Sequence, residues 1–82
     1  MFFKIPTYKR DFAPIPEREW ERLDENTFTC AHGRAALRVF RYREDAPWWA
    51  EGYNPSFESA TYFWTAEQAM YWAEQEIKNW FD

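Results

Sequence analysis

The sequence has little of what many sites and scaffolds require. Its one cysteine, Cys30, excludes an intramolecular disulfide, and we therefore expect a reduced, cytoplasmic protein. Its two glycines, Gly33 and Gly52, are too few for a phosphate-binding loop. No apolar run approaches the roughly 18 residues of a membrane span. Because Lys4 and Pro6 interrupt the apolar start of the chain, we expect no signal peptide and no membrane contact.

Aliphatic residues are also few, whereas aromatic residues are abundant. The 82 residues include 8 Phe, 5 Tyr and 6 Trp but only six Val, Leu or Ile. Because each aromatic side chain buries about 150–250 Å², one small core cannot hide all of these rings, and several are expected at the surface. Trp and Tyr are the residue types that anchor binding interfaces. The alternative is that the rings line the core boundary, with only their polar atoms exposed.

Charge is divided between the two halves of the chain. Residues 1–43 hold nine Lys or Arg and six Asp or Glu, whereas residues 44–82 hold eight Asp or Glu and one base, Lys78. The first half therefore carries +3 and the second −7, within a net charge of −4. Such a division favours encounter with an oppositely charged partner.

The first 26 residues predict an arm and a short helix. Residues 1–16 hold three prolines and are expected to form an edge strand up to Tyr8, followed by an irregular arm. Pro16 followed by acidic residues is typical of a helix start. A short helix near Glu17–Leu23 is therefore predicted, with Trp20 and Leu23 turned inward.

From Thr27 to Trp64 the sequence shows the alternation typical of β-strands. Gly33 lies between two such segments, 27–31 and 34–43, and predicts a hairpin. Further strands are predicted at 48–53 and 60–64. We therefore expect residues 27–65 to form an antiparallel sheet of three to four strands.

Residues 66–81 predict an amphipathic helix. Thr65 and Gln68 have the spacing of a capping box, in which the hydroxyl accepts the Gln68 N–H and the amide reaches back to the Thr65 N–H. The apolar stripe consists of Ala66, Ala69, Met70, Ala73, Ile77, Trp80 and Phe81. Residues 1–82 are thus expected to form a single α+β domain, with this helix packed on one face of the sheet.

Catalytic and metal sites find little support in the sequence. Cys30 and His32 would share one side of a strand, but zinc needs three or four ligands and the chain has no further Cys or His. Neighbours on one strand also seldom bring sulfur and imidazole within hydrogen-bonding distance. No two carboxylates stand in apolar surroundings that would split their pKa values. We therefore expect no enzyme, no catalytic residue, no metal and no cofactor.

Four arginines lie in and beside the second strand of the hairpin. They are Arg34, Arg38, Arg41 and Arg43. Together with Phe40 and Tyr42 they suit the phosphates and stacked bases of single-stranded nucleic acid. The acidic second half argues against this function, because the arginines can pair with Glu44, Asp45 and the helix carboxylates within the fold. Direct nucleic-acid binding is therefore the weaker alternative.

The outer side of the terminal helix is the main candidate for a binding surface. The predicted contacts are Trp72, Tyr71, Glu67, Glu74 and Glu76, with Trp48 and Trp49 as a second anchor. An indole framed by carboxylates suits a basic protein surface and imitates the spaced charge of nucleic acid. The alternative is that the N-terminal arm covers Trp72 through Phe12 or Ile15.

The end of the chain carries a resemblance in organisation. The segment YFWT, the helix cap and the closing AEQAMYWAEQEI resemble the small proteins that bacteriophages encode to interfere with their hosts, anti-CRISPR proteins among them. The resemblance covers roughly residues 34–82 and rests on a sheet, an acidic terminal helix and many aromatic residues. It implies an inhibitor in the host cytosol that occupies a site on a nucleic-acid-handling complex, and it assigns no site residues. A homodimer formed through exposed rings is a further alternative.

Overall fold

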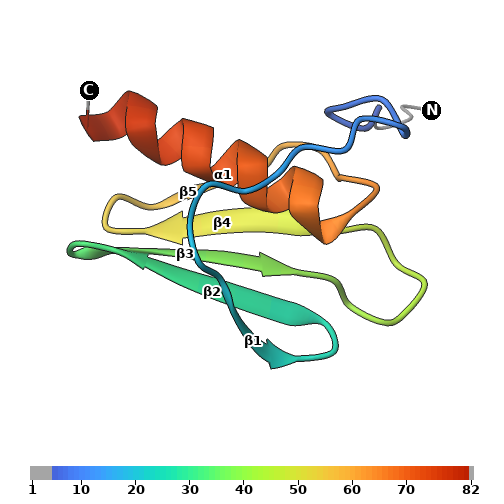
Figure 1. The fold of residues 1–82 in the computed structure, drawn as a ribbon, viewed down its shortest axis with the longest axis horizontal. Helices are drawn as coiled ribbons and strands as arrows, with labels where there is room; N and C mark the ends of the chain where they lie inside the picture. Colours follow the sequence, from blue (N-terminus) through green and yellow to red (C-terminus); the bar gives the residue numbers. More distant parts are fainter. Residues whose placement is uncertain (1–4, 82) are drawn as a thin grey trace.

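The sheet and the terminal helix predicted from the sequence are both present (Figure 1). The computed structural model describes residues 5–81, apart from the side chain of Phe81. Its elements are β1 (Glu21–Asp24), β2 (Thr27–His32), β3 (Ala35–Phe40), β4 (Trp49–Tyr53), β5 (Phe57–Glu58) and α1 (Ala66–Phe81). The strands form one antiparallel sheet in chain order, and α1 lies across one face of it. The α+β class is confirmed, with five strands where three or four are predicted.

The predicted hairpin is formed by β2 and β3, with Thr27 opposite Phe40 at its open end. Gly33 lies in the turn at φ 61°, a left-handed conformation that glycine adopts without steric cost. Leu37 and Val39 alternate with more exposed residues and are buried beneath α1. The alternation of apolar and polar residues in this part of the sequence therefore corresponds to the two faces of the strand.

The helix predicted over Glu17–Leu23 is wrong, because residues 21–24 form β1 and the residues before it are irregular. The backbone N–H groups of Glu17 and Arg18 each donate to the Glu74 carboxylate, both at 2.9 Å. The Trp20 indole donates to the same carboxylate at 3.0 Å. These tertiary bonds hold the segment alongside α1 and override its local preference for a helix.

The strand predicted at 60–64 is also wrong, because β5 forms the ladder beside β4. Among the described residues, the strand pairing of residues 60–64 is limited to an isolated bridge between Trp48 and Phe63. The Trp48 N–H donates to the Phe63 carbonyl at 3.0 Å, and the Phe63 N–H donates to the Trp48 carbonyl at 2.8 Å. The chain thus leaves the sheet before it reaches α1.

The predicted N-terminal edge strand is not found in the described part of the chain. Residues 1–4 lie outside that part, and residues 5–8 form no strand. The Thr7 N–H donates to the Tyr62 carbonyl at 3.1 Å, which ties this segment to the approach to α1. The arm therefore lies beside the helix and is not a strand of the sheet.

The cap of α1 also holds the N-terminal arm. The Thr65 hydroxyl accepts the Gln68 N–H at 3.1 Å, as predicted. The side-chain oxygen of Gln68, Oε1, accepts the Trp64 N–H at 3.1 Å and does not reach back to the Thr65 N–H. The Gln68 amide donates to the carbonyls of Lys9 and Phe12 at 3.0 and 2.7 Å. Gln68 is fully buried, and these bonds supply the partners that a buried amide requires.

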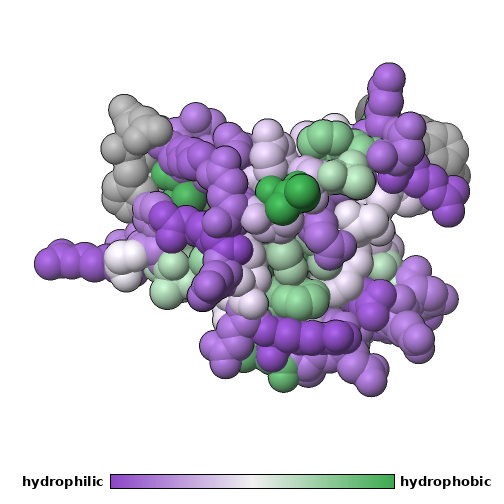
Figure 2. Space-filling view, in the orientation of Figure 1, coloured by the Kyte–Doolittle hydropathy of each residue, from purple (hydrophilic) through white to green (hydrophobic). Residues whose placement is uncertain are grey.

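The core lies between α1 and the centre of the sheet. Its buried residues on α1 are Ala66, Ala69, Met70, Ala73 and Ile77, and those on the sheet include Leu37, Val39 and Ala50. Trp80 is predicted in the apolar stripe of α1 but is 56% exposed, and among the described side chains Ile77 is the last buried residue of the helix. On the face turned to the viewer in Figure 2, hydrophilic side chains dominate and hydrophobic residues form small, separate patches.

Glu74→Ala tests the carboxylate that holds the segment before β1. The substitution leaves three donors without an acceptor, and hydrogen bonds to a charged group contribute about 1.5–3 kcal/mol each, although not additively. We expect the free energy of unfolding to fall by about 3 kcal/mol or more. The measurement is urea unfolding followed by tryptophan fluorescence.

Two further variants make this test specific. Glu74→Gln should have an intermediate effect, because its amide keeps one acceptor oxygen but turns an NH₂ group towards donors. Glu67→Ala removes an exposed glutamate of the same helix and should cost no more than about 1 kcal/mol. Equal losses for Glu74→Ala and Glu67→Ala would contradict the structural role of Glu74.

Candidate partner-binding surface

The aromatic anchors predicted from the sequence are mostly covered. Trp72 is half-buried, and its ring centroid lies 6.0 Å from that of Phe57 and 5.8 Å from that of Phe63. Trp48 is only 8% exposed, and the Arg41 guanidinium lies 4.7 Å from its ring centroid. These two indoles therefore contribute mainly to the packing of the fold.

The carboxylates predicted around Trp72 do not form a rim. The exposed position predicted for Glu74 is wrong, because this residue is 1% exposed and binds the segment before β1. Glu67 is exposed in the first turn of α1, and Glu76 is half-buried. Tyr71 packs against Phe12 of the arm at 5.8 Å, whereas Ile15 is 85% exposed. The structure thus does not assemble these side chains into one exposed surface.

The four arginines of the nucleic-acid alternative point to different places. Arg38 forms an ion pair with Glu51 at 2.8 Å, and Arg43 forms one with Asp45 at 3.0 Å. Arg41 Nε donates a hydrogen bond to the side-chain oxygen of Asn26 at 2.8 Å. Arg34 is exposed beside the hairpin turn. Arg43 thus pairs with Asp45, a predicted partner, whereas Arg38 pairs with Glu51, which is not among the predicted partners, and no described carboxylate of α1 takes part.

The face of the sheet opposite α1, which we call the open face, carries a different set of side chains. In an antiparallel ladder, residues directly opposite each other point to the same face. Because the buried residues of β3 face α1, Phe40 and the opposite Trp49 of β4 point away from it. Arg38 and Glu51 are the neighbouring pair on this face. Figure 1 shows α1 on the other side of the sheet.

A row of aromatic rings crosses the open face and continues beyond β4. It consists of Tyr42, Phe40, Trp49, Tyr62 and Trp64. Ring centroids are 5.6 Å apart for Tyr42 and Phe40, and 6.4 Å apart for Trp49 and Tyr62. Both contacts are edge-to-face, a favourable geometry for aromatic pairs. Tyr42 is 77% exposed, so the row offers aromatic contact area to a partner.

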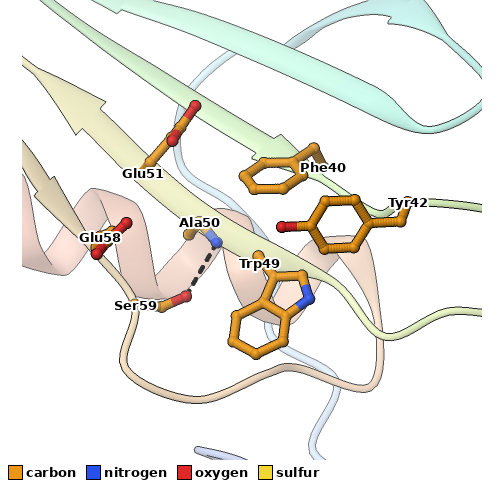
Figure 3. A pocket seen from close by; sticks show the side chains of 7 residues that line it. All are labelled: Phe40, Tyr42, Trp49, Ala50, Glu51, Glu58 and Ser59. Carbon is orange, nitrogen blue, oxygen red and sulfur yellow. Dashed lines mark hydrogen bonds between the residues drawn. The ribbon is translucent and has the colours of Figure 1, made fainter.

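Three rings of this row line a shallow hollow of about 310 Å³ (Figure 3). Phe40, Tyr42 and Trp49 stand close together in this view. Glu51 and Glu58 lie to one side of them, on β4 and β5. Ligand pockets commonly have volumes of about 300–1,000 Å³, so the hollow has the size for a single side chain or a small group.

The charges around the hollow are uneven. Glu51 and Glu58 are directly opposite each other on neighbouring strands, a like-charge pair that destabilises a sheet. Glu51 accepts hydrogen bonds from Arg38 Nη1 at 2.8 Å and from the Tyr53 hydroxyl at 2.7 Å. The bond to Glu51 raises the pKa of the Arg38 guanidinium, against the lowering effect of burial. Among residues 5–81, no cation or donor is paired with the exposed Glu58 carboxylate.

Cys30 and His32 lie at the end of β2. Cys30 is 6% exposed, and burial raises the pKa of its thiol, which disfavours the nucleophilic thiolate. Within residues 5–81, no three His, Cys, Asp or Glu side chains are placed to hold a metal ion. The described part of the chain also has no helix with the length and apolar character needed to cross a membrane.

The sequence pattern alone does not group Phe40, Tyr42, Glu51 and Glu58 into one site. The alternation of β3 indicates that Phe40 points away from the core, but its neighbours on the open face come from β4 and β5. A correct prediction that β4 pairs with β3 would have placed Trp49 opposite Phe40 and begun to group these residues.

No protein-family model, curated protein sequence or solved structure matches this chain. The resemblance to host-interference proteins stays a prediction. The function is therefore inferred from the residues of the open face and from the charges around them.

Trp72→Ala separates packing from partner binding. Because the ring packs on Phe57 and Phe63, its loss should lower the free energy of unfolding by about 2–4 kcal/mol. The 56% exposed Trp80 is the matched control, and Trp80→Ala should change stability by no more than about 0.5–1 kcal/mol. Thermal unfolding followed by circular dichroism measures both. Similar effects of the two substitutions would show that Trp72 is not part of the core.

Glu58→Gln tests the like-charge pair. Removing one of two opposed carboxylates should raise the free energy of unfolding by about 0.2–1 kcal/mol. Glu67→Gln makes the same chemical change near the N-terminus of α1, where a negative charge is favourable, and should lower it by about 0.3–1 kcal/mol. Urea unfolding at low ionic strength measures both changes in the free energy of unfolding, which should have opposite signs. A loss of stability in Glu58→Gln would contradict the repulsion inferred for this pair.

Proposed function

We propose that the protein is a binding module whose open face docks on a basic surface of a host protein and inhibits that protein by occupying it. The observation that carries this proposal is the row of aromatic rings beside Glu58, a carboxylate with no ion-pair partner among residues 5–81, on the face of the sheet opposite α1. Aromatic anchors within a polar surround are typical of the energetic centre of an interface.

The charges of the open face favour a basic partner. The register of the strands places the carboxylates of Glu21, Glu51 and Glu58 on this face. Arg38 shares the face and offsets one of them. The remaining negative charge favours docking on Lys- or Arg-rich surfaces. Spaced carboxylates also imitate phosphates, which supports a partner that handles nucleic acid, as the resemblance to phage proteins implies.

Binding of single-stranded nucleic acid is the second candidate, because exposed rings stack bases. It requires free cations beside the rings, and the Arg38 guanidinium is already bonded to Glu51 at 2.8 Å. The carboxylate of Glu58 would also repel phosphate. A homodimer formed through the same rings is the third candidate, and in it the partner is a second copy of this chain.

The proposal is tested by two matched charge reversals in affinity capture from a native host lysate. Glu58→Lys reverses a charge on the open face, and Glu67→Lys makes the same change on α1. We expect wild type and Glu67→Lys to retain the same partner, and Glu58→Lys to bind that purified partner at least about tenfold more weakly, because it places like charges in contact. Calorimetry measures the three affinities. Equal affinities for Glu58→Lys and Glu67→Lys would rule out docking through the open face.

Two controls separate the other candidates. Filter binding of single-stranded RNA at low salt, with retention that falls steeply as salt increases, would favour the nucleic-acid candidate. Light scattering on the purified protein measures its mass in solution. A dimer that Trp49→Ala converts to a monomer would favour the homodimer.

A further inference from the structure

We infer that the guanidinium groups of Arg22 and Arg41 form a binding site for one phosphate group. Arg22 lies on β1 and Arg41 follows β3, and Figure 1 shows the β1–β2 turn and the end of β3 at the same end of the sheet. Arg22 is opposite Phe28 in the ladder, and Phe28 is opposite Val39, which is buried beneath α1. The site is therefore on the helix side of the sheet, separate from the open face, and it does not depend on the proposed function.

Both guanidinium groups converge on one backbone oxygen. Arg41 Nη2 donates to the Glu25 carbonyl at 3.2 Å, and Arg22 Nη2 donates to the same oxygen at 3.5 Å. Two groups that share an acceptor at these distances are close enough for one tetrahedral anion to contact both. Planar guanidinium groups also match the geometry of phosphate oxygens, to which they donate two parallel hydrogen bonds.

Each guanidinium is also held on an aromatic ring. Arg22 lies 5.6 Å from the ring centroid of Phe28, and Arg41 lies 4.7 Å from that of Trp48. The two rings are themselves in contact, with their centroids 5.8 Å apart. Because both side chains are ordered before a ligand arrives, binding costs less conformational entropy.

The positive charge of this pair is not neutralised within the described part of the chain. Among residues 5–81, neither guanidinium forms an ion pair. Their hydrogen-bond acceptors are neutral, namely the backbone carbonyls of Asp24, Glu25 and Glu44 and the side-chain oxygen of Asn26. The Asp24 carboxylate instead accepts the Asn26 N–H at 2.7 Å. Two like charges held this close repel each other, and an anion that contacts both removes the repulsion.

The two side chains keep donors for a ligand. A guanidinium has five N–H donors. Arg41 uses three of them, one each to Asn26, Glu44 and Glu25, and Arg22 uses two. Half of the donors of the pair thus remain, and Arg22 is exposed to solvent. Phosphate oxygens carry the lone pairs and the negative charge that these donors require.

The probe is inorganic phosphate, titrated at pH 6.5 into ¹⁵N-labelled protein while the arginine Nε–H signals are followed by NMR. The Nε–H groups of Arg22 and Arg41 are hydrogen-bonded within the protein, which slows their exchange with water. We expect both signals to shift together and to saturate with a dissociation constant of about 1–10 mM, because a few charge-assisted hydrogen bonds at an accessible site provide this affinity. Sodium chloride at the same ionic strength should shift neither signal.

Protein variants test the assigned pair. Arg22→Gln should weaken phosphate binding by at least about fivefold, because it removes charge-assisted hydrogen bonds. Arg34→Gln removes the same charge from the turn at the other end of β2 and should change the affinity by less than about twofold. Arg22→Lys should give an intermediate loss, since it keeps the charge but not the planar fork. Circular dichroism checks that the three variants fold.

Two results would overturn the inference. One is the absence of a saturable shift with phosphate, and the other is an equal loss of affinity in Arg22→Gln and Arg34→Gln. A site that only holds the β1–β2 turn together would give the first of these results.

Matched ligands identify the source of the phosphate. Adenosine 5′-monophosphate should shift the signals of Arg22 and Arg41, and adenosine should shift neither. Tighter binding of the nucleotide than of inorganic phosphate would identify a nucleotide phosphate as the ligand, whereas equal or weaker binding would identify the free ion. An equal effect of adenosine and its monophosphate would contradict recognition of phosphate.

Discussion

The buried carboxylate of Glu74 is the contact on which the arrangement of the chain depends. It is 1% exposed and accepts hydrogen bonds from Glu17, Arg18 and Trp20. Because an unpaired buried carboxylate is costly, the fold requires these donors in place. The segment before β1 therefore runs along α1, and the chain enters the sheet only at Glu21, as an additional strand beside β2. The part of the N-terminal arm that includes Lys9 and Phe12 lies against α1.

The contacts of the arm explain which rings are left for the open face. Gln68 binds the carbonyls of Lys9 and Phe12, and the ring of Tyr8 packs against Tyr71 at 6.2 Å. Part of the aromatic excess noted in the sequence is used in this way, to fasten the arm to α1. Phe40 and Trp49 lie in the aromatic row on the other face of the sheet.

The sequence predicts those parts of the fold whose deciding contacts are local. The cap at Thr65 depends on a residue three positions away, and the hairpin depends on Gly33 and on alternation within its two strands. The helix predicted at 17–23 fails because its N–H groups bond to Glu74, which lies 57 residues beyond Glu17. No local pattern contains that contact.

The same limit applies to the candidate site. Helical geometry places Trp72 outside the apolar stripe, but only the tertiary structure shows that Phe57 and Phe63 pack against it. Alternation in β3 indicates that Phe40 points outward. Its relation to Glu58 depends on β5, a strand of two residues that is too short to produce a sequence signal. The rings of the surface could thus be predicted as a class, but not their grouping.

Two features of the open face work against the stability of the free domain. Glu51 and Glu58 oppose each other across β4 and β5, and Tyr42 exposes most of its ring. Proteins tend to break the local rules of stability where function requires it. A cationic partner of the proposed kind would relieve both features in one event, because it would neutralise the Glu58 carboxylate and cover the ring of Tyr42. Of the residues predicted to form a surface on α1, Glu74 is satisfied and Trp72 is packed, and this contrast is why we place the function on the sheet rather than on the helix.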